Sequence, residues 1–334
     1  MTENKKIVNL GIQFVYDQVF NASYKNRFIR LKSTIFNRLF NLILKTGDPL
    51  IKHDISGVTL FLPFSHQLPF ILKNYPLYSS NLARLAKYVK QKYEHLKFID
   101  IGANIGDSIA LLRKEAEFPI LCIEGDEQFL SVLEKNATLF SEVHIVKAYL
   151  GDSSHSIRGT TIKQGGTAHL SENKVGDNII EIKKLSDVLK DYPLFLQSKM
   201  IKLDTDGFDC KILRGAADFL KSAKPIIFFE YDPFFLSDQG DDGISIFPDL
   251  SSYGYKNLLI YDNFGDLMIS TNIDNYRLLK EIHLYFSGRL GHRYCDICVF
   301  HTEDNDLFEI AREREVQFFE NIRGIKKADN AYSL

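Results

Sequence analysis

A turn that contains two glycines, set between an apolar strand and a helix, constrains the fold of this chain more than any other feature. Residues 98–107 have the sequence FIDIGANIGD, in which an apolar run leads into Gly102 and Gly106. A second apolar run at 120–123 ends in the acid Glu124. A strand, a glycine turn, a helix and a second strand with a terminal acid form half of a nucleotide-binding α/β sheet.

The glycine spacing indicates which nucleotide this turn binds. Gly102 and Gly106 are four residues apart, so the sequence lacks the G-x-G-x-x-G cradle of a pyrophosphate. A glycine at 102 lets the backbone approach a ligand that has no phosphate groups. Glu124, at the end of the second strand, can accept hydrogen bonds from both hydroxyls of a ribose. These features favour S-adenosylmethionine over NAD.

The alternation of strands and helices continues along the chain. Strands are predicted at about 98–102, 120–124, 143–149, 199–204 and 225–230, and helices at about 107–116, 126–140, 184–191 and 208–222 separate most of them. This pattern predicts a parallel sheet with right-handed crossovers. A hairpin is expected at 258–269, and a final strand at 294–301.

Two further segments carry a family resemblance. Residues 200–216 have the sequence MIKLDTDGFDCKILRGA, and residues 224–230 have the sequence KPIIFFE. With the first motif they resemble the FkbM family of S-adenosylmethionine-dependent methyltransferases, over roughly residues 60–300. That family typically shows D-x-G-A-N-x-G-D, then K-x-D-x-E-G-x-E-x-x-x-L-x-G-A, then K-P-x-I-x-x-E. Asp206 and Asp209 stand where the family usually has glutamates, which shortens each side chain by one methylene.

The resemblance implies a fold and an activity. The implied fold is an α/β, Rossmann-like, seven-stranded class I methyltransferase sheet, mostly parallel with an antiparallel last strand. The implied activity is O-methylation of a hydroxyl on a sugar, glycan or natural product. Two other functions stay open. One is a nicotinamide-dependent oxidoreductase, which the missing phosphate cradle disfavours; the other is an inactive binding or scaffold protein with a methyltransferase fold, to which Asp206 and Asp209 give some weight.

Three regions are expected: an N-terminal basic helical extension at 1–50, a methyltransferase domain at 51–303, and a C-terminal helix and tail at 304–334. The first 47 residues carry eight Lys or Arg against two acids, a local charge of +6. Phe36, Leu39, Phe40, Ile43 and Leu44 form one helical stripe there. The extension either packs on the main domain or on a second subunit, or meets a membrane or a lipid-linked acceptor.

Composition bounds the partners and the location. The net charge of −2 gives no nucleic-acid signature. Four cysteines in 334 residues do not suggest a disulfide framework. No signal-peptide pattern opens the sequence, and no apolar run approaches the roughly 20 residues of a transmembrane helix. The expected location is the cytoplasm, and the expected partner is a small-molecule or glycan acceptor, with a homo-oligomer as an option.

The cofactor residues are expected beyond the carboxyl ends of the strands, where ligands bind in open parallel sheets. They are Asp100, Gly102, Ala103, Asn104, Gly106, Asp107, Glu124, Gly125, Asp126, Gly151, Asp152, Ser153 and Asp204.

Several of these acids have two interpretations. Asp100 either bonds the turn backbone or makes a water-mediated contact to the ammonium of the cofactor. Asp126 either contacts the adenine side or caps its helix. Asp152, assisted by Ser153, is expected near the adenine amino group, and Glu124 at the ribose.

The predicted catalytic residues are Asp204, Asp206, Glu230 and His169. Asp204, Asp206 and Glu230 either act as a general base and ligands of a divalent cation, or Asp204 orients the cofactor ammonium while Asp206 caps a helix. His169 lies in the segment 153–178, which is expected to be either a loop that folds over the acceptor or a mobile surface loop.

Three residues outside these motifs carry weaker signals. His66, just before the core, is a candidate contact for cofactor or acceptor. Cys295 and Cys298 form a single C-x-x-C, which we interpret as core and edge residues because one pair lacks partners for a zinc site.

Overall fold

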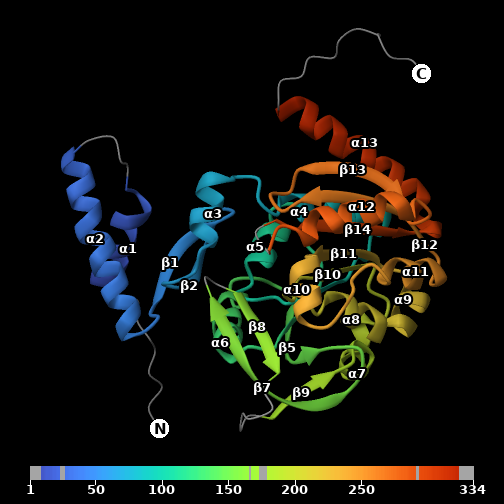
Figure 1. The fold of residues 1–334 in the computed structure, drawn as a ribbon, viewed down its shortest axis with the longest axis horizontal. Helices are drawn as coiled ribbons and strands as arrows, with labels where there is room; N and C mark the ends of the chain where they lie inside the picture. Colours follow the sequence, from blue (N-terminus) through green and yellow to red (C-terminus); the bar gives the residue numbers. More distant parts are fainter. Residues whose placement is uncertain (1–8, 23–26, 165–166, 173–178, 291–292, 323–334) are drawn as a thin grey trace.

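The computed structural model describes residues 9–22, 27–164, 167–172, 179–290 and 293–322. Its centre is an eight-stranded sheet of order β13-β12-β14-β11-β10-β3-β4-β5 (Figure 1). The strands span β3 (Phe98–Ile101), β4 (Ile120–Glu124), β5 (Val143–Lys147), β10 (Met200–Leu203), β11 (Ile226–Tyr231), β12 (Tyr255–Asp262), β13 (Leu267–Asn272) and β14 (Cys295–His301). This is the α/β, mostly parallel Rossmann-like sheet with an antiparallel last strand that the resemblance implies, with eight strands instead of seven.

Strands β5, β4, β3, β10 and β11 run parallel to their neighbours. Strand β14 lies between β11 and β12 and is antiparallel to both, as expected for the final strand. The hairpin expected at 258–269 is formed by β12 and β13, and β13 extends the sheet by an eighth strand.

Helices cover both faces of the sheet, which is why β3, β4, β10 and β11 are buried along their whole length. One face packs against α4 (Ser80–Lys92), α5 (Asp107–Arg113) and α13 (Asn305–Ile322). The other face packs against α7 (Leu185–Lys190), α8 (Asp209–Gly215), α9 (Ala217–Ala223), α11 (Ile246–Ser252) and α12 (Tyr276–Ser287). Helix α6 (Glu127–Ala137) follows β4, and α10 (Pro233–Asp238) follows β11.

A four-stranded sheet of order β6-β9-β7-β8 replaces much of the loop expected at 153–178. Strands β7 (His155–Gln164) and β8 (Thr167–Glu172) form an antiparallel hairpin, and β7 also pairs with β9 (Ile179–Lys183), which pairs with β6 (Tyr149–Leu150). The loop prediction was therefore wrong for these residues. Thr and Ile residues in 156–163 have strand propensity, and this signal was not recognised.

The N-terminal residues form two helices, α1 (Leu10–Phe20) and α2 (Arg27–Thr46), followed by the hairpin of β1 (Leu50–Ile55) and β2 (Val58–Pro63) and by α3 (Leu68–Asn74). Tyr16 of α1 is fully buried in a cluster with β1, β2 and residues of α5 and α6. The helices thus pack on the main body through the hairpin, at one end of the molecule (Figure 1). Among the described residues, every helix is too short or too polar to cross a bilayer.

Candidate functional site

The glycine turn after β3 is held against both neighbouring strands. The backbone N–H of Gly102 donates to the carbonyl of Ile123 over 3.0 Å, and the N–H of Asp204 donates to the carbonyl of Ile101 over 3.1 Å. Gly102 has φ +76°, and a Cβ atom placed on it would lie 1.9 Å from the carbonyl oxygen of Asp204. Position 102 therefore requires glycine both for its conformation and for this close approach.

Glu124 lies at the end of β4, where its carboxylate binds the backbone of two loops. Its Oε2 accepts from the N–H of Asn104 and its Oε1 from the N–H of Asp126, both over 2.8 Å. Burial raises the pKa of Glu124 to about 7, although these N–H donors oppose the shift. Asp126 caps α6 by accepting from the N–H groups of Gln128 and Phe129, which is its predicted capping role.

Asp100 has a side-chain cation as partner, which the sequence interpretation missed. The Nζ of Lys202 lies 3.2 Å from Asp100 Oδ1 and 3.3 Å from Asp204 Oδ2. Ser108 Oγ donates to the other oxygen of Asp100. Burial lowers the pKa of Lys202, but the carboxylates of Asp100 and Asp204 outweigh it and the pKa is raised well above its ordinary value. Lys202 therefore stays charged within the site.

Further carboxylates gather where β10 and β11 end and β14 begins. Burial, and then the charge of Asp204, raises the pKa of Asp206 and Asp209 to about 7 and that of Asp296 to about 8. The same causes raise the pKa of Glu230 well above its ordinary value. Glu230 and Asp296 are directly opposed in the antiparallel register of β11 and β14. Such a concentration of perturbed acids in one place is typical of functional sites.

Two adjoining cavities lie at this edge of the sheet. The smaller, which we call the slot, has a volume of about 80 Å³ and is lined by Glu124, Gly125, Tyr149 and Phe208 among others. The larger, the main cavity, has a volume of about 420 Å³. Both cavities are lined by Gly102, Asn104, Asp204 and Asp206. The slot and the main cavity therefore meet at the glycine turn after β3 and at the turn after β10 that carries Asp204 and Asp206, which we call the acidic turn.

The main cavity is lined mainly by polar side chains. Its lining includes Lys202, Asp107, Glu230, Tyr294 and Asp296. The hydroxyls of Tyr78 and Tyr294 lie 3.3 Å apart. Burial raises the pKa of both tyrosines, so the two hydroxyls stay protonated.

His66 also lines the main cavity. Its Nδ1 accepts from the N–H of Leu68 over 3.3 Å, and burial lowers its pKa to about 4. A neutral imidazole whose Nδ1 is an acceptor carries its proton on Nε2. His66 can therefore donate a hydrogen bond from that atom.

The remaining predicted residues lie in different places. Ala103 and Asp107 line the main cavity, and Gly106 is the N-cap of α5 with φ +83°. Gly151, Asp152 and Ser153 line a separate hollow of about 310 Å³. His169 belongs to β8, where its backbone pairs with Ile162 of β7, but its side chain lies outside the described part of the chain.

No cluster of three or more His, Cys, Asp or Glu that could hold a metal ion occurs among the described residues. This finding gives no support to the divalent cation expected at Asp204, Asp206 and Glu230. Cys295 and Cys298 are free thiols, both buried in β14.

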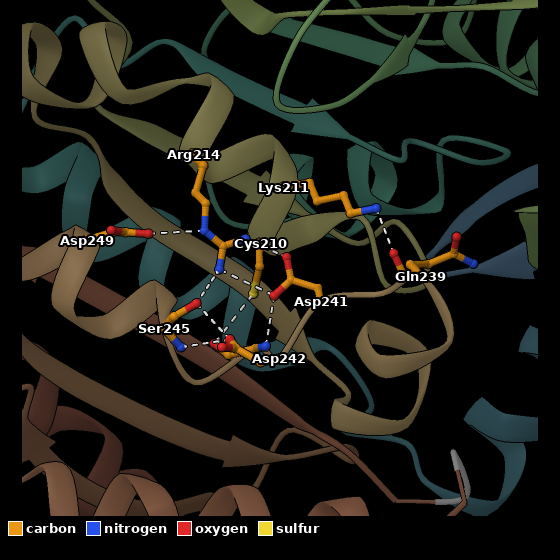
Figure 2. A network of polar contacts seen from close by, with 9 residues as sticks. Cys210, Lys211, Arg214, Gln239, Asp241, Asp242, Ser245 and Asp249 are labelled. Atoms are coloured by element: carbon orange, nitrogen blue, oxygen red, sulfur yellow. Dashed lines mark hydrogen bonds and ion pairs between the residues drawn. The ribbon is translucent and has the colours of Figure 1, made fainter. Parts of the chain in front are cut away.

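A polar network fixes the helix that follows the acidic turn (Figure 2). Arg214 of α8 donates to Asp249 over 3.0 Å and to Ser245 over 2.8 Å, and it also binds Asp241. At the other end of the turn, Gly207 has φ +100°, and a Cβ atom there would lie 2.5 Å from the carbonyl oxygen of Phe235. These contacts hold the acidic turn in place where the slot and the main cavity meet.

Sequence reasoning missed Lys202, Tyr78, Tyr294 and the role of Asp296. For Lys202 a signal existed, because residues 202 and 204 of one strand point to the same face. Tyr78 and Tyr294 belong to no motif, and only the tertiary structure brings them together.

The family profile described as "Methyltransferase FkbM domain" matches residues 100–256. Similar solved structures include methyltransferase FkbM from Methylobacillus flagellatus KT, with 15% identity and a TM-score of 0.33, aligned over 73% of this chain and 53% of that one. The chain thus spans about half the length of that protein.

Two other solved structures are similar to a comparable degree. Precorrin-6y C5,15-methyltransferase from Geobacter metallireducens GS-15 has 14% identity and a TM-score of 0.36, over 66% of this chain and 87% of that one. An O-methyltransferase from Bacillus cereus in complex with SAH has 11% identity and a TM-score of 0.37, over 71% and 90%. No curated protein matches this chain.

Proposed function

We propose that this chain, whose residues 100–256 match the family profile of the FkbM methyltransferase domain, transfers a methyl group from S-adenosylmethionine to a hydroxyl of a sugar, glycan or natural-product acceptor. The observation that carries this proposal is the meeting of the slot and the main cavity at Gly102 and Asp204. The slot suits the cofactor and the main cavity suits the acceptor, with the reacting atoms where the two cavities meet.

The residues around the slot fit the cofactor. Glu124 is buried, and each of its oxygens has a further lone pair for a ribose hydroxyl beside the N–H that it already accepts. Gly102 lines both cavities, and its missing side chain lets the turn at Asp204 pack against it where the two cavities meet. Asp204 and Asp206, on the turn between the two cavities, are candidates to offset the positive charge of the cofactor. S-adenosylmethionine would supply a methyl group on a sulfonium, whose carbon an acceptor oxygen can attack while the neutral thioether, S-adenosylhomocysteine, leaves.

The lining of the main cavity suits an acceptor rich in hydroxyls. Tyr78, Tyr294 and His66 offer neutral donors, while Glu230 and Asp296 offer acceptors. Hydrogen bonds from such groups orient a hydroxyl for an in-line displacement, and orientation is a major part of the rate enhancement.

The proton of the acceptor hydroxyl must leave as the oxygen–methyl bond forms and the sulfur–methyl bond breaks. We propose that the carboxylate of Glu230 accepts this proton. Its Oε2 has no hydrogen-bond partner, and burial and neighbouring acids raise its pKa, which makes the ionised form a stronger base. Asp204 is the weaker candidate because Lys202 lies 3.3 Å from it. The predicted contact of His169 with the acceptor stays a prediction.

The test separates binding from turnover. Calorimetric titration with S-adenosylhomocysteine is expected to show micromolar binding that Glu124→Ala abolishes, while Glu134→Ala, an exposed residue of α6, leaves it unchanged. Labelled methyl transfer to a panel of sugars and glycans is then expected from the wild type and not from Glu230→Gln.

Binding without transfer to any acceptor would support the alternative of an inactive protein that binds or serves as a scaffold. No binding in the wild type would contradict the proposal itself. The proposed activity requires S-adenosylmethionine, which cells make in the cytoplasm, so we expect the protein to act there.

A further inference from the structure

The helical pair α1 and α2 presents an apolar surface to solvent, which we call the hairpin face. It lies at the end of the molecule, where α2 is the outermost element (Figure 1). Five large apolar side chains make up this face: Leu10 (85% exposed), Phe14 (54%), Ile35 (51%), Leu39 (39%) and Leu42 (58%). The ring centroids of Phe14 and Phe36 are 5.8 Å apart, which joins the two helices across the face.

The fold does not need these side chains, because the opposite side of α2 already packs on the protein. Phe40, Ile43 and Leu44 are partly buried against the cluster around β1 and β2. The rings of Phe40 and Phe64 have centroids only 4.2 Å apart. Ile35, Leu39 and Leu42 follow the spacing i, i+4, i+7 and therefore form a separate stripe on the exposed side.

The charge of α2 indicates what covers this stripe. Its sequence contains Arg27, Arg30, Lys32, Arg38 and Lys45 and no acid. Arg38 and Lys45 are exposed on the same helix as the stripe. Apolar side chains bordered by basic ones on a helix are typical of surfaces that lie on anionic membranes.

We propose that the hairpin face docks on the surface of an anionic lipid bilayer. The apolar side chains enter the boundary between headgroups and acyl chains, and the basic ones contact the anionic headgroups. A second copy of this chain suits the face less well. A symmetric dimer through the face would place the basic residues of α2 close to the same residues of the other copy, and α2 itself contains no acid to offset them.

The docking surface is connected to the main cavity. Phe20 is the last residue of α1, and the centroid of its ring lies 5.5 Å from that of Phe70 on α3. The Nζ of Lys73, also on α3, lies 4.8 Å from the centroid of the Phe20 ring. Leu68 and Ile71 of the same helix line the main cavity. Helix α1, which carries part of the hairpin face, therefore contacts α3, which lines the cavity, and this connection suits an acceptor carried by a membrane lipid.

The experiment is co-sedimentation of the full chain with vesicles. Vesicles of phosphatidylcholine with 40% phosphatidylglycerol are compared with vesicles of phosphatidylcholine alone, at low and at high salt. We expect the protein to pellet with the anionic vesicles, less with the neutral ones, and less at high salt, because salt screens the basic residues. The triple variant Ile35→Ser, Leu39→Ser, Leu42→Ser is expected to lower the partition coefficient by at least about tenfold. The charge variant Arg38→Glu, Lys45→Glu is expected to lower it similarly.

A matched control comes from α13, where Ile310, Val316 and Ile322 are 43%, 43% and 49% exposed. This helix carries more acids than bases, so changing all three residues to serine is expected to leave vesicle binding unchanged. The proposal is overturned if the wild type does not pellet with anionic vesicles, or if the triple variant binds them as the wild type does. A wild-type dimer in sedimentation velocity that the triple variant converts to a monomer would assign the face to a second copy instead. Vesicle binding does not depend on the proposed function, so it can fail or succeed separately from methyl transfer.

Discussion

Asp100 and Lys202 form a buried ion pair across the neighbouring strands β3 and β10, with Nζ 3.2 Å from Oδ1. The side chain of Asp100 is fully buried and that of Lys202 is 10% exposed. The parallel register places the two residues side by side. Because Lys202 also lies 3.3 Å from Asp204, a single cation joins the glycine turn to the acidic turn.

Removal of this cation should destabilise the protein. Lys202→Met leaves Asp100 buried without its charged partner, and such losses cost about 3–5 kcal/mol. Urea denaturation would measure the difference from the wild type. The double variant Lys202→Met, Asp100→Asn should recover part of the loss, since no buried charge then remains unpaired. Equal stability of the single and double variants would show that the ion pair does not act in this way.

The close approach at Gly102 can be separated from its backbone conformation by a matched pair of variants. Gly102 has φ +76° and Gly240 has φ +74°, but a Cβ on Gly240 would meet nothing within 4 Å. Gly240→Ala should therefore cost about 1 kcal/mol, from conformation alone. Gly102→Ala should cost several times more and should abolish binding of S-adenosylhomocysteine, because the new atom meets the carbonyl of Asp204. Thermal denaturation and calorimetry check both expectations, and similar behaviour of the two variants would contradict them.

The binding of S-adenosylhomocysteine should depend on pH through Glu124. Its pKa in the folded protein is about 7, above the ordinary 4.5, because burial disfavours the charged carboxylate. Only the ionised form offers all its lone pairs to the ribose, so affinity should fall as the pH drops below about 7 and level off above it. In Glu124→Gln the part of this dependence that comes from Glu124 should vanish, together with most of the affinity, while any part due to Asp206 should remain. Calorimetry between pH 5.5 and 8.5 makes the comparison, and a pH profile shared by the two proteins would exclude the role of Glu124.

The raised pKa of Glu124 affects the stability of the fold in the opposite direction from ligand binding. A raised pKa means that the folded state holds the proton more tightly than the unfolded state does, so the contribution of Glu124 to stability is lost as the pH rises from about 4.5 through about 7.

The C-terminal helix should be required for stability. Arg84 of α4 and Glu315 of α13 pair at 2.6 Å, and the side chain of Glu315 is fully buried. Arg84→Met should cost about 3–5 kcal/mol in the free energy of unfolding. The exposed pair of Arg312 and Glu309 on the same helix is the control, since Arg312→Met should cost less than about 1 kcal/mol. A small effect at Arg84 would show that this buried ion pair is not what holds α13 against α4.

Local signals in the sequence predict much of this structure. The strands β3, β4, β10 and β11 are mostly apolar because helices bury both faces of the sheet, although Asp100 interrupts β3 and Lys202 interrupts β10, and such apolar runs are easy to identify. The cap at Asp126 is also local, because its partners are two and three residues away.

Contacts between distant segments were harder to predict. The hairpin of β7 and β8 was missed because it is set by pairing between strands, which a search for helical or alternating apolar patterns does not detect. Tyr78 and Tyr294 lie 216 positions apart in the sequence, and Asp296 enters the site only because β14 runs against its neighbours. An antiparallel strand begins at the edge where the parallel strands end, so its first residues reach the cavity.

The placement of β14 also sets an order on the assembly of the protein during synthesis. In the described sheet, β12 is joined to β11 only through β14, the last strand to leave the ribosome. Until residues 295–301 emerge, the hairpin of β12 and β13 has no place in the sheet beside the first five strands. The wall formed by β3, β4 and β10 can be complete while the wall that holds Tyr294 and Asp296 does not yet exist. A nascent chain can thus form the wall of the slot before the wall of the main cavity at Tyr294 and Asp296 is built.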